Sequence, residues 1–374
     1  MDTTSLLAGA PATATAVAII DLAAVAQNFR SLRSFHGAPL AGVVKADAYG
    51  LSAARIAPVL IREGAQVLFT AGFDEAAALP ADVPRAVLDG LTPGSELDFA
   101  AAGLLPVLND LGQLRSWARL SRELGRRLPC LVHLDTGMAR LGFDAADTAR
   151  LIADPSDLDA VDVHYVMTHL AAADDPHEKL NEWQRARFEA ACAKLPPMKR
   201  SLANSSGIFL GERFRSDLAR PGAATYGINP TPGRPNPMRP VVSLHARLLQ
   251  VREISPGDSV GYGASFVARR PTRIATAAIG YADGFPRAMA GRSGAARALG
   301  ALDGTEFPLV GRVSMDLTTF DVTDLPEGAL VPGGWVTMMD AANDADALGA
   351  RANTIGYEIL TGLSRRAHRI WHGA

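Results

Sequence analysis

The feature that most constrains the fold is an alternation of short apolar runs with amphipathic segments before residue 228. Near-continuous apolar runs are typical of parallel strands that are buried on both faces. The segment 114–124 between two such runs has apolar residues three and four positions apart, which predicts a helix with one buried face. The eight runs end, in order, at Lys45, Ala71, Gly90, Asn109, Asp135, His169, Ser205 and Gly227. Eight strand–helix units predict a (β/α)8 TIM barrel.

Polar or charged residues close most of these runs. They are Lys45, Asp89, Asn109, Asp135, His169, Asn204 and Ser205. Barrels of this type keep their chemistry at the carboxyl ends of the strands. The sequence therefore predicts a functional site at that end of the barrel.

A proline-rich segment, INPTPGRPNPMRP at 228–240, separates two patterns in the chain. Five of its thirteen residues are proline, which supplies no backbone donor to a helix or a sheet. After it, Val242, Leu244, Ala246 and Leu248 alternate with polar residues, as in a strand with one buried face. We expect a flexible tail over 1–15, the barrel over 16–240 and a mainly antiparallel β domain over 241–374. The run 16–22 precedes the first barrel helix and could instead be a strand of the β domain.

Charge and composition exclude several classes of partner. The net charge is −2, with 37 basic and 39 acidic residues, so nucleic acid is not an expected partner. A membrane is not expected either, because no apolar run approaches the roughly 18 residues of a membrane helix. The two cysteines fit a reducing compartment, and residues 1–29 contain no Lys or Arg that could begin a signal peptide. We therefore expect a cytoplasmic protein. The eight histidines lack metal-ligand spacing, so no metal site is expected.

Lys45 and two later loops are the candidate chemical groups. A lysine that ends a buried strand is partly desolvated, which favours the neutral amine needed for a Schiff base. The alternative is a lysine that extends its amine to solvent at the barrel rim. Residues 204–207, Asn-Ser-Ser-Gly, and 220–223, Arg-Pro-Gly-Ala, follow the last two strands, where this fold commonly binds phosphate. Ordinary turn chemistry explains either loop alone, but their coincidence with Lys45 indicates pyridoxal phosphate (PLP).

Nine motifs in this chain occur in the order found in the bacterial alanine racemases. They are VVKADAYG, HLDTGMARLG, MTHLA, ANSSG, ARPGAATYG, GDSVGYGASF, GYADG, GRVSMD and IGYE. The chain resembles that family from about Val17 to its C-terminus. The resemblance implies a PLP-binding (β/α)8 barrel followed by a β domain, working as a homodimer with shared active sites. It also implies an isomerase that interconverts L-alanine and D-alanine, either to supply D-alanine for peptidoglycan or to catabolise it.

The resemblance assigns roles to residues of both predicted domains. Lys45 would hold PLP and act as the base on the D side, and Tyr262, given by the partner subunit, would be the base for L-alanine. Arg220 would face the pyridine nitrogen, and His169 would orient Arg220. The residues implied to contact the cofactor are Lys45, Tyr49, His169, Asn204, Ser205, Arg220, Gly222, Ala223 and Tyr357. Arg140 and the backbone N–H of Met315 would hold the substrate carboxylate, and Tyr281 and Asp283 would line the entrance.

Two positions depart from the family pattern. His133 stands where the family often has a lysine that braces the arginine corresponding to Arg140, and Ser314 stands where a cysteine is common. Neither residue is one of the two bases.

Three other functions remain open at this point. The pocket could accept serine or larger amino acids, which would make the chain a racemase of broader range. A basic amino-acid decarboxylase has a related architecture, but that chemistry favours an acidic partner at the pyridine nitrogen, where this chain aligns Arg220. A non-catalytic PLP-binding protein would resemble the barrel alone, and the residues after the linker argue against it.

Overall fold

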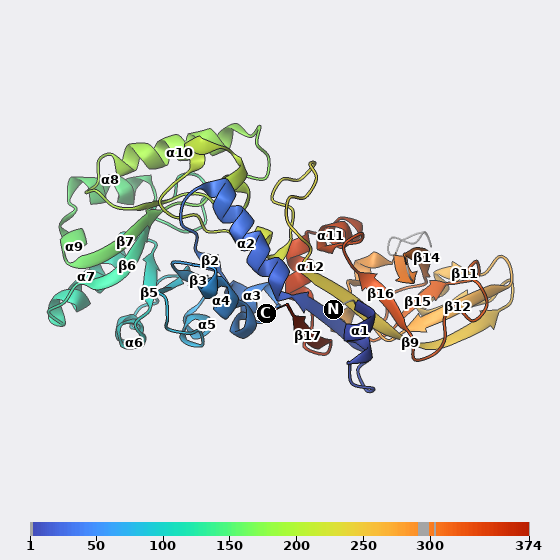
Figure 1. The fold of residues 1–374 in the computed structure, drawn as a ribbon. Coiled ribbons are helices and arrows are strands. Elements are labelled where there is room, and N and C mark those ends of the chain that lie inside the picture. The colour runs from blue at the N-terminus through green and yellow to red at the C-terminus, as the bar shows by residue number, and fades with distance from the viewer. Residues whose placement is uncertain (1–2, 291–298, 303, 374) are drawn as a thin grey trace. The chain divides into compact units, whose positions relative to one another are not determined.

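The computed structural model describes residues 3–290, 299–302 and 304–373. The chain divides into two compact units, which Figure 1 shows with their elements labelled. Residues Val25–Arg239 form one, called here the barrel unit. Met1–Ala24 and Pro240–Ala374 form the other, called here the sheet unit.

Seven parallel strands form the sheet of the barrel unit in chain order. They are β2 (Gly42–Val43), β3 (Leu68–Thr70), β4 (Arg85–Val87), β5 (Leu105–Leu108), β6 (Leu128–His133), β7 (Val161–Met167) and β8 (Arg200–Ser201). A parallel bridge between Leu40 and Ala219 joins the segment after β8 to the start of the sheet. The eighth predicted run is only a bridge, because Pro221 has no N–H to donate and 223–226 fold into a 3₁₀ turn. The expected (β/α)8 barrel is confirmed in this form.

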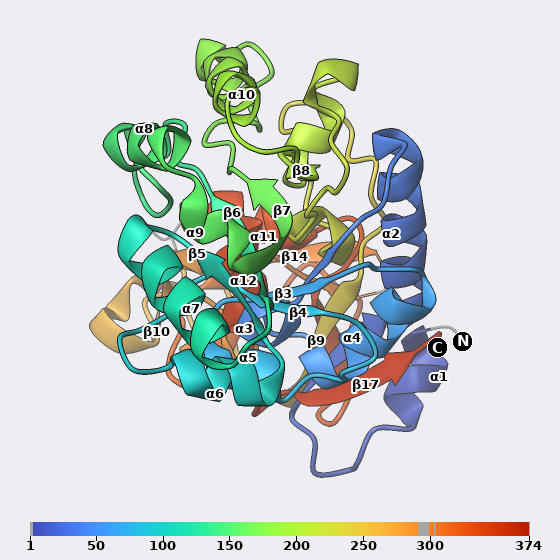
Figure 2. The same ribbon diagram turned by 90° about the vertical axis from the view of Figure 1, so that its left-hand side faces the viewer.

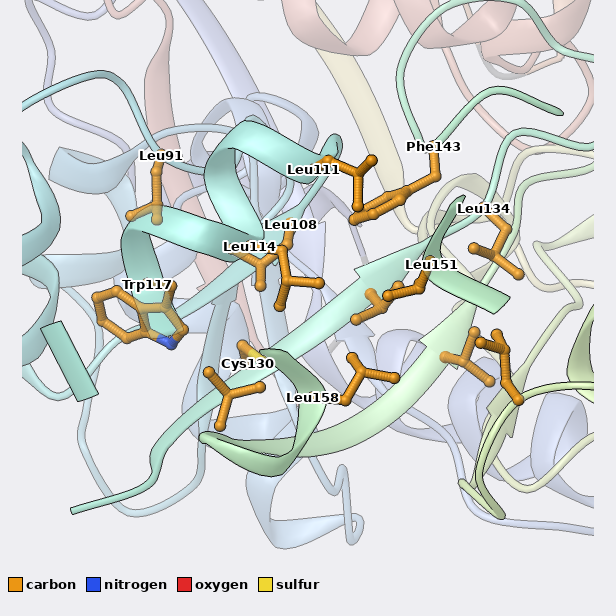
Figure 3. Packing of buried hydrophobic residues seen from close by; sticks show 14 of the residues in the cluster. Leu91, Leu108, Leu111, Leu114, Trp117, Cys130, Leu134, Phe143, Leu151 and Leu158 are labelled. Carbon is orange, nitrogen blue, oxygen red and sulfur yellow. The ribbon is translucent and has the colours of Figure 1, made fainter. Parts of the chain in front are cut away.

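Helices lie around the outside of the barrel strands (Figure 2). They are α2 (Leu22–His36), α4 (Ala53–Arg62), α5 (Phe73–Ala77), α6 (Glu96–Ala102), α7 (Leu111–Glu123), α8 (Ala145–Ala153), α9 (Ser156–Asp159) and α10 (Lys179–Cys192). Helix α7 shows how the sequence determines one of them. Asp110 accepts a hydrogen bond from the backbone N–H of Gln113 and so caps its start. Leu114 and Trp117 are fully buried and face Leu108 and Cys130 of the strands (Figure 3).

The sheet unit is built on eight strands, in the order β12-β15-β14-β13-β16-β9-β1-β17. Its strands are β1 (Ala16–Asp21), β9 (Val242–Ile254), β12 (Thr272–Ala277), β13 (Leu299–Leu302), β14 (Thr305–Val310), β15 (Thr318–Asp321), β16 (Trp335–Met339) and β17 (His368–His372). Strand β1 pairs parallel with β17 and antiparallel with β9, and the other pairs are antiparallel. The expected mainly antiparallel β domain is confirmed. Its sheet includes the run 16–22, which is one of the two placements that the sequence allows.

The unit also contains two short strands and two helices near its C-terminus. Strands β10 (Ser259–Val260) and β11 (Phe266–Val267) form a separate antiparallel pair. Helices α11 (Ala345–Ala352) and α12 (Gly356–Gly362) precede β17.

The N-terminal segment differs from the flexible tail expected over 1–15. Residues Thr3–Ala8 form helix α1. Its Leu6 and Leu7 are buried against Val17 and Ile19 of β1. A helix of six residues is not stable alone, so this one depends on the apolar contact with the sheet, which the local sequence does not reveal.

Within the described ranges, no helix has both the length and the apolar character needed to span a bilayer.

Candidate active site

The barrel unit carries nine of the residues expected to form the site. They are Lys45, Tyr49, Arg140, His169, Asn204, Ser205, Arg220, Gly222 and Ala223. Each lies in a segment that follows a barrel strand, at the carboxyl end where this fold places its active sites. Tyr262, Tyr281, Met315 and Tyr357 lie in the sheet unit.

Lys45 begins an unusual turn, α3 (Lys45–Tyr49), and Val44 alone separates it from the end of β2. The next four residues, 46–49, all have left-handed backbone angles, with φ between 53° and 55°. None of the four is glycine, and each left-handed L-residue costs about 1–2 kcal/mol. Hydrogen bonds inside the turn offset part of this cost, among them Ala48 N–H to the Val44 carbonyl and Gly50 N–H to the Ala46 carbonyl, both 2.8 Å. Such strain is typical of a functional segment.

The Lys45 amine is half-buried and has charged neighbours of both signs. Burial lowers its pKa below the ordinary value, and the positive charge of Arg140 lowers it further. Asp89 and Glu75 oppose this change. A lowered pKa increases the share of neutral amine, which is the form that attacks an aldehyde or accepts a proton.

The Tyr49 ring closes one side of a cradle formed with the loop 220–223. A Cβ added at Gly222 would lie 2.2 Å from Tyr49 Oη, so only glycine allows this approach. The ring of Tyr49 stacks against that of Tyr226 with centroids 4.7 Å apart. Tyr226 in turn donates a 2.7 Å hydrogen bond to the Val43 carbonyl at the end of β2.

Ser205 and Asn204 hold the loops 204–207 and 220–224 in shape. Ser205 Oγ accepts hydrogen bonds from Gly222 N–H (3.0 Å) and Ala224 N–H (3.2 Å). Asn204 Oδ1 accepts from Gly207 N–H at 2.9 Å. Hydroxyl and backbone N–H groups that converge next to a glycine are suited to bind phosphate.

Arg220 is 4% exposed and is fixed by two neutral acceptors. Its guanidinium donates to Ser201 Oγ and to the Thr168 carbonyl. Burial lowers its pKa to about 10, so it remains protonated at neutral pH. The acceptors of these two bonds belong to Ser201 and Thr168, not to His169. The expected role of His169 in orienting Arg220 therefore stays a prediction.

His133 and His169 lie among the cations of the site. Burial lowers the pKa of His133 to about 4, with a further contribution from Arg220. Burial and Arg220 also hold the pKa of His169 well below its ordinary value. Both rings are therefore neutral at pH 7.

Asn109 determines which nitrogen of His133 carries the proton. The Asn109 amide nitrogen donates to the Leu88 and Val107 carbonyls, at 3.1 and 3.0 Å, which leaves its oxygen toward His133. That oxygen lies 2.8 Å from His133 Nδ1, so Nδ1 must donate. His133 Nε2 is then a neutral acceptor.

Asp135 shapes the loop that carries Arg140. Its Oδ1 accepts hydrogen bonds from the backbone N–H groups of Gly137 and Met138. The N–H group of Ala139 donates to both carboxylate oxygens. The Arg140 side chain is exposed, and its charge lowers the pKa of both Lys45 and His133. The charge of Arg140 is thus close enough to affect the Lys45 amine.

Tyr262 in the sheet unit is presented to solvent, with 71% of the residue exposed. The glycines on both sides, Gly261 and Gly263, have φ of 71°, which allows the sharp turn. A Cβ at Gly263 would lie 3.2 Å from Arg312 Cζ, so this cation packs against the tyrosine loop.

Tyr281 and Met315 lie together in the same unit. Tyr281 N–H donates to the Ser314 carbonyl at 3.1 Å, and Ala282 N–H donates to the Met315 carbonyl at 3.0 Å. Asp283 holds this loop, because its carboxylate accepts from Gly280 N–H and pairs with Arg366. Ser314 takes part in this contact through its backbone carbonyl.

Tyr357 is the remaining expected site residue of the sheet unit. It lies in the first turn of α12 and is 39% exposed. Its proposed contact with phosphate stays a prediction.

The residues of the barrel unit fit PLP. The cofactor has an aldehyde, which requires a neutral amine such as that of Lys45, and a phosphate, which suits the cradle of Tyr49, Ser205 and Gly222. Arg140 and Arg220 supply positive charge, and the two neutral histidines add no further charge.

Glu75 and Arg312 support the expected site but were not recognised in the sequence, because each acts on a segment distant in the chain and no local pattern identifies it. Asn109 was expected as a polar residue at a strand end, but its contact with His133 was not.

A half-buried amine near a strand end, with loops around Ser205 and Gly222 suited to phosphate, is what a barrel enzyme of the PLP-dependent class requires. Models of the alanine racemase N-terminal domain and C-terminal domain match residues 20–230 and 241–371. The chain belongs to the alanine racemase family.

Relatives match over nearly the whole chain. The chain is 49% identical to the alanine racemase of Acidiphilium cryptum over 94% of this chain and 97% of that protein. It is 46% identical to a catabolic alanine racemase of Mesorhizobium japonicum over 97% and 94%. It also superposes on the crystal structure of alanine racemase from Bartonella henselae with covalently bound pyridoxal phosphate. That match has a TM-score of 0.91 and 38% identity, and it covers 96% of this chain and 100% of that one.

Proposed function

We propose that this chain is a PLP-dependent alanine racemase that interconverts L-alanine and D-alanine with two bases, Lys45 and Tyr262. The observation that carries the proposal is the half-buried Lys45, whose pKa is lowered by burial and by Arg140, beside the cradle of Gly222 and Ser205. Membership of the alanine racemase family supports the identity of the substrate.

Lys45 and Tyr262 divide the proton transfer at the substrate Cα. PLP, when bound, supplies an electron sink that makes this proton removable. Lys45 Nζ takes or returns the proton on one face of Cα, and Tyr262 Oη does so on the other. Two bases on opposite faces invert the centre without turning the substrate over.

Arg140 and Met315 would bind the alanine carboxylate. Arginine offers a fork of N–H donors that matches a carboxylate, and the Met315 N–H would add a backbone donor. Their hold on the carboxylate keeps Cα between the two bases. Tyr281 would line the entrance to this site.

The remaining barrel residues would hold the cofactor. Tyr49, Ser205, Gly222 and Ala223 would bind its phosphate, with Asn204 shaping the loop. Arg220 would face the pyridine nitrogen. Because Arg220 stays protonated at neutral pH, that nitrogen would stay neutral, which weakens the electron sink and disfavours side reactions such as transamination.

Tyr357 and His169 are assigned to the cofactor by family resemblance. Tyr357 would reach the phosphate, and His169 would lie near the ring.

A homodimer with shared active sites completes the proposal. The Tyr262 side chain is 71% exposed, and it would serve the site of the other subunit. In the same way, Tyr262 of the partner subunit would serve Lys45 of this chain. A cytoplasmic location is also proposed, and the two buried free cysteines support it.

Chiral analysis tests this function. Purified protein loaded with PLP and incubated with L-alanine should give equal amounts of the two enantiomers, because the free energies of mirror images are equal. L-serine and L-lysine in parallel incubations measure the substrate range, and a racemase of broader range would convert them at comparable rates. Unchanged L-alanine, from protein shown to contain PLP, would support a non-catalytic PLP-binding protein.

A further inference from the structure

We propose that Glu75 is a positioning residue that fixes the left-handed turn after Lys45 and thereby sets the place of the amine. The inference rests on the proposed function of Lys45. It assigns to Glu75 a role in cofactor binding and in proton transfer that acts through the turn.

The Glu75 carboxylate joins the ends of two neighbouring barrel strands. It comes from the short helix α5, and its Oε1 accepts from Ala46 N–H at 2.8 Å. Its Oε2 accepts from Ala71 N–H at 2.9 Å, directly after β3. Both oxygens are thus used, and each bonds to backbone next to a strand end. Hydrogen bonds with a charged acceptor are roughly twice as strong as neutral ones.

The bond to Ala46 is placed where the backbone is most strained. Ala46 follows Lys45 directly and is the first of the four left-handed residues 46–49. Such a conformation persists only where the surroundings over-determine it. Asp47 holds the far end of the turn, because its Oδ1 accepts from Ala53 N–H at 2.8 Å. Glu75 holds the near end, at the lysine.

The charge of Glu75 acts on the lysine in a second way. Burial and Arg140 both lower the pKa of Lys45, and Asp89 and Glu75 both raise it. Glu75 therefore limits how far the pKa falls. An amine that must both take and return a proton needs a pKa near the working pH.

Substitution by glutamine separates this role from simple packing. Glu75→Gln keeps the length of the side chain but removes the charge and offers only one acceptor oxygen. Either the Ala46 N–H or the Ala71 N–H then faces the NH₂ group of the glutamine and loses its acceptor. Glu75→Asp keeps the charge but is one methylene too short to span both donors. Asp74→Asn is the matched control, because it removes a neighbouring carboxylate that is exposed.

The lysine content makes the measurement direct. The sequence contains only four lysines, Lys45, Lys179, Lys194 and Lys199. In the full-length chain labelled with ¹³C-lysine and freed of cofactor, NMR should resolve four side-chain signals, and the one lost in Lys45→Ala is Lys45. Its pKa should fall in Glu75→Gln, because the carboxylate charge that raises it is removed. The dissociation constant of PLP should rise at least about tenfold.

The other variants should separate the effect on the Lys45 pKa from the effect on PLP binding. Glu75→Asp should weaken PLP binding with a smaller change in the pKa of Lys45, and Asp74→Asn should change neither. A folded Glu75→Gln protein in which both quantities equal those of the wild type would overturn the inference. So would rapid hydrogen exchange at the Ala46 amide of the wild-type chain, a measurement that needs no variant to fold.

Failure of the proposed function would look different. Borohydride reduction of the loaded wild-type protein should attach PLP to Lys45. A label on another lysine would refute the role of Lys45 in the reaction, whereas the Ala46 exchange and the Lys45 pKa would still decide whether Glu75 holds the turn.

Discussion

The two proposed bases are built in opposite ways. Lys45 is half-buried and begins a strained turn whose two ends are held by carboxylates, and the charges around it alter its pKa. Tyr262 is 71% exposed and lies on a short turn between two glycines. The lysine is thus prepared by its own unit, whereas the tyrosine is presented outward. This difference favours a site in which the exposed base completes the environment of a buried one in another subunit.

The largest expected effect is that of Lys45→Ala. Racemisation should fall by at least about 10³-fold, because the variant loses both a base and the covalent anchor of the cofactor. Polarimetry in both directions measures the rate. Lys199→Ala, which removes another of the four lysines, is the control and should keep wild-type activity. Substantial activity in Lys45→Ala would mean that Lys45 is not one of the two bases.

Tyr262→Phe should lower the rate by about 10²-fold. The removed hydroxyl belongs to an exposed side chain, so the melting temperature and the dissociation constant of PLP should stay unchanged. A lower rate with unchanged stability and unchanged PLP affinity would distinguish Tyr262 from Lys45, because substitutions around Lys45 should change cofactor binding as well. A loss of stability in Tyr262→Phe would show instead that the tyrosine is a structural residue.

Gly222→Ala should weaken PLP binding by about tenfold, because the new Cβ would lie 2.2 Å from Tyr49 Oη and must displace the ring. Fluorescence titration of the protein with PLP measures the change. Gly72→Ala is the matched control, since no atom lies within 4 Å of the Cβ it would add. Equal affinity in both variants would mean that Tyr49 and Gly222 do not form the phosphate cradle.

The effect expected at His133 is on stability and on its dependence on pH, not on rate or cofactor binding. Burial lowers its pKa from 6.5 to about 4, so between these values the unfolded chain binds a proton that the folded chain does not. Stability from this group is therefore present above pH 6.5 and is lost as the pH falls toward 4, in total about 3 kcal/mol. His133→Gln should reduce the slope of unfolding free energy against pH in this range, and His177→Gln, at an exposed site, should not. If the slope in His133→Gln equalled that of the wild-type protein, His133 would not be held neutral in the folded chain.

The sequence predicts the barrel and the place of the site because both depend on local patterns. Apolar runs that end in Lys45, His169 or Ser205 combine a strand and its functional end within a few residues. The contacts of Glu75 and Asn109 could not be predicted, because each joins ends of different strands. The left-handed turn was also unforeseen, since residues 46–49, Ala-Asp-Ala-Tyr, contain no glycine to indicate it.

Subunit mixing tests the shared site most directly. Lys45→Ala and Tyr262→Phe chains, each nearly inactive, are mixed under conditions that exchange subunits, and exchange is verified by mass spectrometry. Random exchange makes about half of the dimers mixed, and in each mixed dimer one site carries both lesions and the other carries none. About a quarter of all sites should then be intact, so activity should recover toward a quarter of the wild-type value. If both bases of a site came from one chain, every site would keep a lesion, and no recovery after verified exchange would contradict the shared site.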